Sequence, residues 1–518
     1  MVGGVDVPRM RVVVAAAAVA AVLVPVIASG GTSAHEHWHA LRRDASRPAV
    51  VPPGTALLTV GTATGSPPVH PGFLGLSLEF PAIQAYATSD PQLFEQLVRN
   101  LAPGQSPILK IGGDSTDWAW WPVPGMARPP GVRYTLGRRW LGATRRVARA
   151  LGARLILGID LEADSARLAA TEARAFLAGI GRQWIDALEL GNEPELYPSW
   201  GWYRAADGVE IPGRPHSYGF NAYTENYGSV ASFLPRLPLA GPAIGAPGWM
   251  RHVGQFVTSE PRLSLVTLHR YPLQRCFFPA ASPLYPTIHN LLASEASAGL
   301  ASSVARYASL AHAHGLGLRV DELNSVSCGG APGVSNTFAS ALWVLDAAFQ
   351  MARVGVDGVN IHTFPGATYG LFDFRRLRGI WGALVHPEYY GLMMFAQAAP
   401  PRSELMRVSG RFPEGVRAWA TRATDARIRV VLINDSSVAR AVAVRIPAAG
   451  ATATLERLTA PGIRATRGVM LGGQTFGART TTGVLAGAPR RTSVAPARGE
   501  YPVILPAASA ALLTLQRS

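Results

Sequence analysis

Eight short apolar runs separated by helical stretches constrain the fold of this 518-residue chain more than any other feature. The runs are GFLGLSLEF (72–80), PILKIGG (107–113), RLILGID (154–160), IDALELG (185–191), GPAIGAP (241–247), LSLVTLHRY (263–271), LGLRVDEL (316–323) and DGVNIHTF (357–364). Longer Ala-, Leu- and Arg-rich segments of helical character lie between most of them. Eight such βα units predict an α/β fold, a (β/α)8 TIM barrel. A doubly wound sheet is the alternative, but no Gly-rich phosphate loop follows the first run.

The pattern changes after the barrel segment, which we place at residues 71–400. Residues 401–518 contain short runs with period-two alternation, such as RIRVVLIND and AALLTLQRS, separated by turn residues. This pattern is typical of an antiparallel β-sandwich, which is predicted as the C-terminal domain. The run ALLTVG (56–61), within an N-terminal segment at 35–70, is expected to add a strand to that domain.

The first 34 residues resemble an export signal. Basic residues precede an apolar core at 12–28, and small residues follow it. Cleavage is expected after Ala28 or Ala34, which predicts a secreted, extracellular protein with no stable membrane insertion after cleavage. An uncleaved membrane anchor is the alternative, but Pro25 interrupts the alanine-rich run and makes it a poor span.

The distribution of charge along the chain argues against a nucleic-acid partner. The chain has 48 basic and 33 acidic residues, a formal net charge of +15, and Lys110 is its one lysine. The arginines are scattered, without a basic block interleaved with aromatic residues, so no nucleic-acid partner is expected. A basic surface favours acidic substrates by long-range attraction.

Two carboxylates stand out at the predicted carboxyl ends of the barrel strands, where barrel enzymes hold their active sites. Glu193 follows the fourth run and Glu322 ends the seventh. These strands lie across the barrel mouth from each other, so the two carboxyls can flank a glycosidic bond, as retaining glycosidases require. The simpler readings are a solvated loop acid for Glu193 and an ion pair with Arg319 for Glu322.

Several segments resemble one glycosidase family. ELGNEPELY and VDELNSVSCGG look like the acid/base and nucleophile motifs of glycoside hydrolase family 79, the β-glucuronidase and heparanase-like enzymes of clan A. LGLSLEF, LKIGGDSTD, TLHRYPL and VHPEYYGLMMF resemble further landmarks of that family, in the same order. The resemblance covers roughly residues 70–518 and includes the second domain.

The resemblance implies catalytic roles. Glu193 would be the acid/base and Glu322 the nucleophile. Asn192 would bind the sugar 2-hydroxyl, a contact that tightens in the transition state. Tyr271 would orient Glu322 by a hydrogen bond, and Glu79 would hold sugar hydroxyls on the far side.

The resemblance also implies a site for the carboxylate of a uronic acid. The backbone N–H groups of Gly329 and Gly330 and the hydroxyl of Tyr369 would receive it. Glycine lets backbone donors approach an anion closely, and a phenol adds a neutral donor. Asp114 is a further candidate contact, suited to an anionic sugar only if it binds hydroxyls.

The cysteines and histidines complete the set of candidate residues. Cys276 and Cys328 follow neighbouring strands, and in an exported protein they are predicted to form a disulfide. His269 and His362 end different strands and are expected to be hydrogen-bonding groups. No metal-ligand spacing is visible, and neither a metal nor an organic cofactor is expected.

The sequence therefore predicts a secreted retaining β-glycosidase acting on glucuronic-acid-containing saccharides or glycoconjugates, most specifically an exo-β-glucuronidase. A clan A glycosidase acting on a neutral sugar, of the arabinofuranosidase or xylanase type, is one alternative. A non-catalytic glycan-binding exported protein is the other. The tryptophan-rich segments DWAWW (117–121) and YPSWGWY (197–203) suit either sugar platforms or packing, and Tyr197 and Trp200 have no predicted role.

Overall fold

Eight parallel strands close into a barrel in the computed structural model, which describes residues 55–446 and 451–515. The strands are β2 (Leu74–Glu79), β3 (Ile108–Gly112), β6 (Arg154–Ile159), β7 (Ile185–Leu190), β10 (Leu239–Ile244), β11 (Leu263–Arg270), β12 (Gly317–Leu323) and β13 (Gly358–His362). They pair in chain order, and β13 pairs with β2 to close the ring. The predicted barrel is confirmed: each apolar run supplies one strand, although β10 begins two residues before its run.

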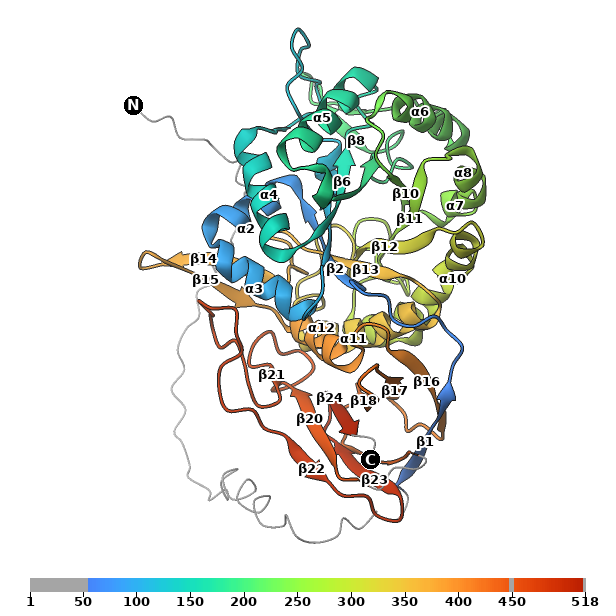
Figure 1. Cartoon of the computed structure of the whole chain (residues 1–518), viewed down its shortest axis with the longest axis vertical. Helices are drawn as coiled ribbons and strands as arrows, with labels where there is room; N and C mark the ends of the chain where they lie inside the picture. The colour runs from blue at the N-terminus through green and yellow to red at the C-terminus, as the bar shows by residue number, and fades with distance from the viewer. Residues whose placement is uncertain (1–54, 447–450, 516–518) are drawn as a thin grey trace, which may run out of the picture. The chain divides into compact units, whose positions relative to one another are not determined.

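Helices surround this barrel (Figure 1). They are α2 (Phe80–Ser89), α3 (Pro91–Leu101), α4 (Arg138–Leu151), α5 (Ala166–Gly179), α6 (Phe220–Phe233), α7 (Pro247–Met250), α8 (Val253–Ser259), α9 (Ile288–Leu292), α10 (Ala298–Ala313), α11 (Phe338–Arg353) and α12 (Pro387–Ala398). In α4, Trp140, Val147 and Leu151 share the buried face, while the arginines at 145, 146 and 149 are exposed. Gly152 ends α4 in the left-handed conformation, at φ 61°. Amphipathic helices of this kind cover the apolar outer face of the strands.

Short elements enlarge the loops that leave the carboxyl ends of the barrel strands. They are η1 (Gly113–Thr116), β4 (Ala119–Trp120), β5 (Tyr134–Thr135), β8 (Gly201–Arg204), β9 (Glu210–Pro212), η3 (Ser294–Ala296), β14 (Phe372–Leu377) and β15 (Ile380–Val385). One further short helix, η2 (Arg182–Trp184), precedes β7 at the opposite end of the barrel. The pairs β4–β5, β8–β9 and β14–β15 follow β3, β7 and β13. Most of this added structure therefore lies at the end of the barrel that carries active sites in this fold.

A C-terminal β domain follows the barrel, as predicted. Its strands are β16 (Glu404–Gly410), β17 (Val416–Arg422), β18 (Ile428–Asn434), β19 (Arg440–Arg445), β20 (Ala453–Thr459), β21 (Met470–Leu471), β22 (Thr492–Val494), β23 (Glu500–Leu505) and β24 (Ser509–Leu515). β1 (Ala56–Ala63) lies between β16 and β19, antiparallel to the first and parallel to the second. Side chains from both arms of this sheet, such as Leu58, Val444 and Leu513, share one core, so the sheet folds over itself as a sandwich.

The β domain packs against the barrel through α11. Trp419 of β17 stacks on Phe349 with ring centroids 5.4 Å apart, and its indole Nε1 donates to Asp346 Oδ1 at 2.8 Å. Arg417 Nε lies 3.5 Å from Asp346 Oδ2. This contact fixes the helix between β12 and β13, two strands that carry residues of the cavity described below.

The predicted signal peptide, residues 1–34, lies outside the described residues, as does most of the segment at 35–70. Within 55–446 and 451–515, no helix has the length and apolar character that crossing a membrane requires.

Candidate active site

A cavity of about 930 Å³ opens at the carboxyl ends of the barrel strands. Eight of the nine residues predicted to act on a substrate line it: Glu79, Asp114, Asn192, Glu193, Tyr271, Glu322, Gly329 and Tyr369. The ninth, Gly330, is not part of the lining. The residues that the sequence scatters over almost 300 positions therefore share one site, at the end of the barrel where chemistry is expected.

Glu193 and Glu322 face each other in this cavity. Three atoms lie within 4.8 Å of one another: one carboxylate oxygen of Glu193, one of Glu322 and a ring nitrogen of His269. Retaining glycosidases hold their two carboxyls about 5–5.5 Å apart, whereas inverting enzymes leave about 6.5–9.5 Å for a water molecule. The separation fits direct attack by one carboxylate while the other donates a proton.

The chain turns sharply at Glu193. This residue has a left-handed backbone with φ 45°, which is costly for a residue other than glycine, and its N–H donates to Ala243 O at 2.9 Å. Its Oε1 lies 3.0 Å from His269 Nδ1. The Lys110 ammonium, which can only donate, lies 3.0 Å from His269 Nε2. Nε2 must then accept, so Nδ1 carries the proton and donates to Glu193.

The proton affinities of the two carboxyls differ strongly. Burial, and then the charge of Glu322, raise the pKa of Glu193 to about 7. Burial also lowers the pKa of His269, to about 4, and the neighbouring Lys110 acts in the same direction. His269 is therefore neutral at physiological pH, and Glu193 holds its proton up to about neutrality.

Glu322 is held ionised by its neighbours. The Tyr271 hydroxyl donates to its Oε1 at 2.7 Å, and the Lys110 ammonium and the His362 ring lie 3.4 and 3.7 Å from its Oε2. Burial by itself would raise the pKa of this carboxyl, but the charges of His362 and Lys110 and the Tyr271 hydrogen bond keep it well below its usual range. Arg319, the ion-pair partner considered from the sequence, bonds instead to Asn360 and to backbone carbonyls.

Lys110 on β3 supplies the positive charge at the centre of the site. Its fully buried ammonium lies 3.5 Å from Glu189, 3.8 Å from Asp321 and 3.4 Å from Glu322. Burial opposes this charge, but the surrounding carboxylates raise the pKa of Lys110 above its usual value. Glu193, His269 and Glu322 have the ligand types of a metal site, and the Lys110 ammonium lies beside them, against Nε2 of His269 and Oε2 of Glu322.

Asn192 is oriented by a network beneath the cavity floor. Its Oδ1 accepts from Lys110 at 3.3 Å, and its backbone N–H donates to Asp117 Oδ2 at 2.9 Å. The Tyr197 hydroxyl donates to the same Asp117 oxygen at 2.8 Å. A side chain at Gly191 would come within 2.4 Å of that hydroxyl, so glycine is needed there. This network gives Tyr197 a structural role that the sequence did not indicate.

Glu79, His362 and Asp114 lie at the carboxyl ends of the adjacent strands β2, β13 and β3. Glu79 accepts from the Ser115 backbone N–H at 2.8 Å and lies 3.4 Å from His362 Nε2. Asp114 opens into the cavity, yet the low-polarity surroundings and the charges of Glu79, Glu193 and Glu322 raise its pKa well above the usual range. A carboxyl that stays neutral can donate to a sugar hydroxyl without repelling a nearby anion.

The predicted carboxylate site differs from the sequence expectation at one position. Gly329 lines the cavity, and no described group accepts its backbone N–H. The Gly330 N–H instead donates to Ser327 O at 3.3 Å, which is a turn contact. The role expected for Gly330 is therefore not available in this loop conformation. Tyr369 lines the cavity beside Gly329, with its ring 6.2 Å from that of Tyr271.

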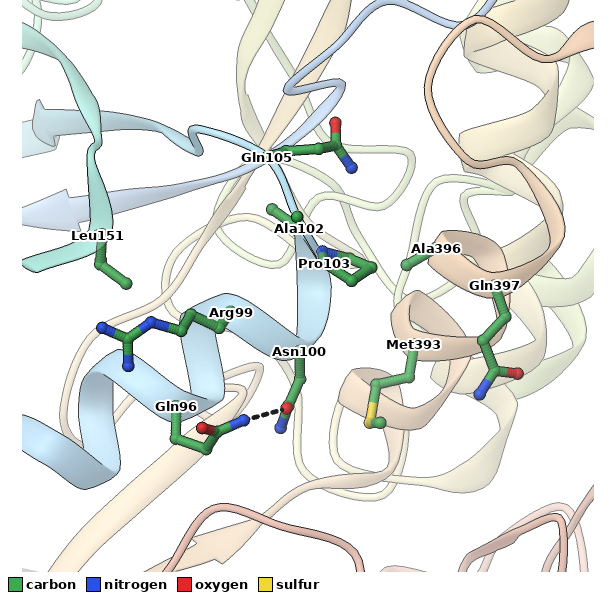
Figure 2. Close-up of a pocket in the computed structure, with 11 residues that line it drawn as sticks. Gln96, Arg99, Asn100, Ala102, Pro103, Gln105, Leu151, Met393, Ala396 and Gln397 are labelled. Atoms are coloured by element: carbon green, nitrogen blue, oxygen red, sulfur yellow. Dashed lines mark hydrogen bonds between the residues drawn. The ribbon is translucent and has the colours of Figure 1, made fainter. Parts of the chain in front are cut away.

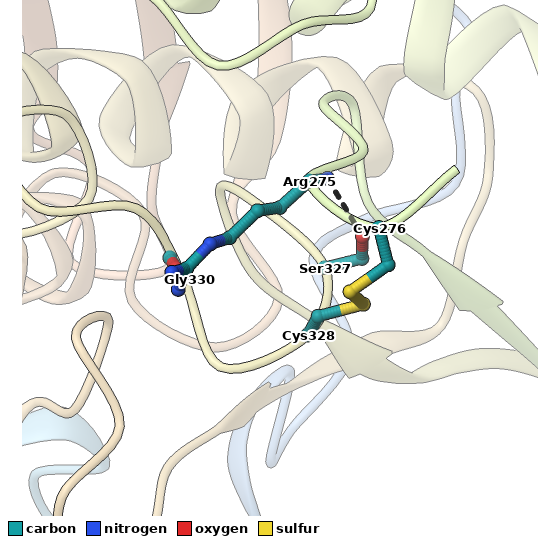
Figure 3. Close-up of a disulfide and its surroundings, with 5 residues drawn as sticks. All are labelled: Arg275, Cys276, Ser327, Cys328 and Gly330. Atoms are coloured by element: carbon teal, nitrogen blue, oxygen red, sulfur yellow. Dashed lines mark hydrogen bonds between the residues drawn. A yellow bond between two sulfur atoms is a disulfide. The ribbon is translucent and has the colours of Figure 1, made fainter. Parts of the chain in front are cut away.

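The predicted disulfide is confirmed: Cys276 and Cys328 are bonded (Figure 3). It joins the loop after β11 to the loop after β12. Arg275, beside it, donates from Nη1 to Gly330 O at 3.0 Å and from its backbone N–H to Ser327 Oγ at 3.3 Å. The covalent bond and these two hydrogen bonds fix the wall that carries Gly329.

Sequence reasoning missed Lys110, Asp117 and Arg275 as parts of the site. Lys110 carried a usable signal, because a lone lysine inside an apolar run must be paired when it is buried. Asp117 and Arg275 stand in irregular segments, where no periodicity indicates the direction of a side chain.

A second cavity, of about 570 Å³, lies between the end of α3 and α12 (Figure 2). It shares no lining residue with the first. Two of its amides bond to neighbouring groups: Gln96 donates to Asn100 at 2.8 Å, and Asn100 donates to Tyr389 and to Gly483 O. These contacts join the barrel to the C-terminal domain and indicate a structural role.

The chain resembles known glycosidases in sequence. Residues 418–512 match the model of the glycosyl hydrolase family 79 C-terminal beta domain. The chain is 25% identical over 454 residues to a beta-glucuronidase of Aspergillus niger, covering 79% of this chain and 78% of that protein. It is 24% identical over 406 residues to a beta-glucuronidase of Neurospora crassa, covering 69% and 68%.

Solved structures share the fold. A 4-O-alpha-L-rhamnosyl-beta-D-glucuronidase from Fusarium oxysporum superposes with a TM-score of 0.69 at 20% identity, covering 89% of this chain and all of that one. A GH51 arabinofuranosidase from Xanthomonas axonopodis pv. citri gives a TM-score of 0.61 at 13% identity, with the same coverage.

Proposed function

Since this chain is a glycoside hydrolase and belongs to family 79, we propose that it is a retaining β-glucuronidase that releases terminal glucuronic acid from a saccharide or glycoconjugate. The observation that carries the proposal is the pair Glu193 and Glu322. Their carboxyls approach within 4.8 Å, and their surroundings push their pKa values in opposite directions. Two carboxyls whose pKa values are pushed apart in this way suit the acid and the nucleophile of a glycosidase.

In the first step, Glu322 attacks the anomeric carbon while Glu193 donates its proton to the departing oxygen. The bond between the anomeric carbon and the leaving group breaks, and a covalent glycosyl–enzyme forms. Tyr271 and Lys110 hold the attacking carboxylate in position. Asn192, whose orientation is fixed by Lys110 and Asp117, binds the sugar 2-hydroxyl in this proposal.

The second step reverses the role of Glu193. Once Glu322 is esterified, its negative charge no longer raises the pKa of Glu193, so this carboxyl becomes a better base. It removes a proton from a water molecule, which attacks the anomeric carbon and releases Glu322. Two displacements at one carbon return the original anomeric configuration.

The preference for a uronic acid rests on the wall formed by the loops after β12 and β13. Gly329 offers a free backbone N–H and Tyr369 a phenol.

A direct assay tests the proposal. We expect the protein to hydrolyse an aryl β-glucuronide, and proton NMR should detect β-glucuronic acid as the first product, before mutarotation. Aryl β-glucoside, β-xyloside and α-arabinofuranoside serve as neutral comparisons. Faster turnover of a neutral glycoside, or an α-anomer as the first product, would refute the assignment.

Replacing Tyr369 by Phe tests the carboxylate site. Hydrogen bonds to charged groups contribute about 1.5–3 kcal/mol, so we expect kcat/KM for an aryl β-glucuronide to fall about ten- to a hundredfold. Turnover of the matching β-glucoside, which lacks the carboxylate, should change little. Tyr203→Phe, outside the cavity lining, is the control. Equal losses on both substrates would mean that Tyr369 does not read the carboxylate.

The protein is also proposed to be exported, on the strength of the signal-like segment at 1–34. The expected result is recovery of activity outside the cells that express the full chain, with a mature N-terminus after Ala28 or Ala34. Mass spectrometry of the recovered protein decides this. If the protein is found only inside the cells and still begins with Met1, the proposal of export is contradicted.

A further inference from the structure

Exposed apolar side chains gather at the catalytic cavity. Trp200, Phe277, Phe278 and Leu284 are 53%, 49%, 41% and 37% exposed, and all four line it. We call this set the aromatic rim. In the described part of the chain, the other exposed phenylalanine or tryptophan side chains are Phe233 and Phe412, neither of which lines this cavity. A concentration of exposed apolar surface at one cavity indicates a binding surface rather than chance.

The loop that carries most of the aromatic rim is held in place. Phe277 and Phe278 directly follow Cys276, whose disulfide fixes the loop to the neighbouring wall (Figure 3). The Gln274 N–H donates to Leu284 O at 2.8 Å and closes the base of the loop. Trp200, from the loop after β7, meets Phe277 with ring centroids 5.8 Å apart. The protein thus fixes apolar rings where they stay in contact with water until a ligand covers them.

The order of the barrel strands places the aromatic rim on the side of the leaving group. Glu79 ends β2, and Asp114 and Tyr369 follow β3 and β13; these three strands are adjacent, and the residues form the wall for the sugar. The rim comes from the loops after β7 and β11. Glu193, the proposed proton donor, also follows β7, and a leaving group departs past the acid that protonates it.

We infer that the aromatic rim binds an apolar, ring-containing leaving group, such as a hydroxylated aromatic or polycyclic alcohol conjugated to glucuronic acid. The inference rests on the proposed function and narrows its substrate class. A second sugar would bring several hydroxyls that need partners, and the phenylalanine and leucine side chains offer none. Gln274 and Arg275, the polar side chains of the same loop, already donate to the backbone carbonyls of Tyr271 and Gly330. An apolar ring system instead removes its own surface and that of the rim from water.

The test compares three β-glucuronides: methyl, 2-naphthyl, and a disaccharide with a sugar as the leaving group. The variant is Phe277→Ala/Phe278→Ala, with Phe412→Ala as a matched control at an exposed phenylalanine. For 2-naphthyl glucuronide we expect the double variant to raise KM about tenfold or more, from the apolar contact removed. The methyl glucuronide and the control should be unaffected, and the melting temperature of the variant shows whether it folds.

A binding measurement separates this inference from the proposed function. Calorimetric titration with 2-naphthol should show binding to the wild-type protein and at least tenfold weaker binding to the double variant. This result is expected even if no glucuronide is hydrolysed, an outcome that would refute the β-glucuronidase assignment alone. Equal loss on all three glucuronides, a loss confined to the disaccharide, or unchanged 2-naphthol binding would each overturn the inference.

Discussion

Replacing Glu322 by Gln is expected to abolish turnover of an aryl β-glucuronide, lowering kcat by a factor on the order of 10⁴ or more. The amide keeps the shape of the side chain but cannot attack the anomeric carbon. Folding should survive, because Glu189 and Asp321 still surround the Lys110 ammonium. Steady-state kinetics with the melting temperature of the variant provide the measurement.

Two controls sharpen this result. Glu225→Gln, at an exposed position on α6, should keep full activity. In Glu322→Ala, azide can enter the space left by the carboxylate and attack once, which inverts the anomeric carbon and gives an α-glycosyl azide. Activity within tenfold of wild type in Glu322→Gln, or a β-glycosyl azide from Glu322→Ala, would exclude Glu322 as the nucleophile.

Replacing Glu193 by Gln should have the second largest effect, and the effect should depend on the leaving group. General acid catalysis contributes about 10²–10⁴-fold, so an alkyl glucuronide should lose about that factor. An activated nitrophenyl leaving group needs no proton, and its departure should be slowed far less. Burst kinetics should then show accumulation of the glycosyl–enzyme, because the second step still lacks its base. Equal losses for both leaving groups would contradict the role of Glu193.

The pH profile provides an independent check of the same residue. The first step needs Glu193 protonated and Glu322 ionised. The pKa of Glu193 is raised to about 7 and that of Glu322 lies well below its usual range, so kcat/KM should stay high at acidic pH and fall as pH rises through about 7. In Glu193→Gln this alkaline fall should disappear. If it persists in the variant, another group controls it.

The barrel could be predicted from the sequence because burial on both faces makes parallel strands continuous apolar runs. The run at 107–113 is still recognisable as a strand, because Lys110 is its one charged residue and all its other residues are apolar or glycine. The small pairs β4–β5 and β8–β9 were not predictable. Their strands span only two to four residues, too few for a period-two pattern to appear.

The site was predictable where function follows from position along a strand. Glu193 and Glu322 could be placed because each stands at the carboxyl end of an apolar run. The partners of Lys110 could not be predicted from the sequence. They depend on which residues of β7 and β12 point into the barrel at the same height as Lys110 on β3. The N–H direction of Gly330 depends on three successive left-handed residues, 328–330, which no pattern in the sequence reveals.

The position of β1 has a consequence for how this protein is made. Its partners β16 and β19 lie more than 340 residues later in the chain, so the β domain cannot be completed until synthesis is almost finished. Pairing over such separations is slow, and an unpaired edge strand is prone to aggregate until it is covered. A chain that begins after β1 would retain every cavity residue and still leave open the slot between β16 and β19. The yield of soluble protein would then depend on eight residues that never approach the substrate.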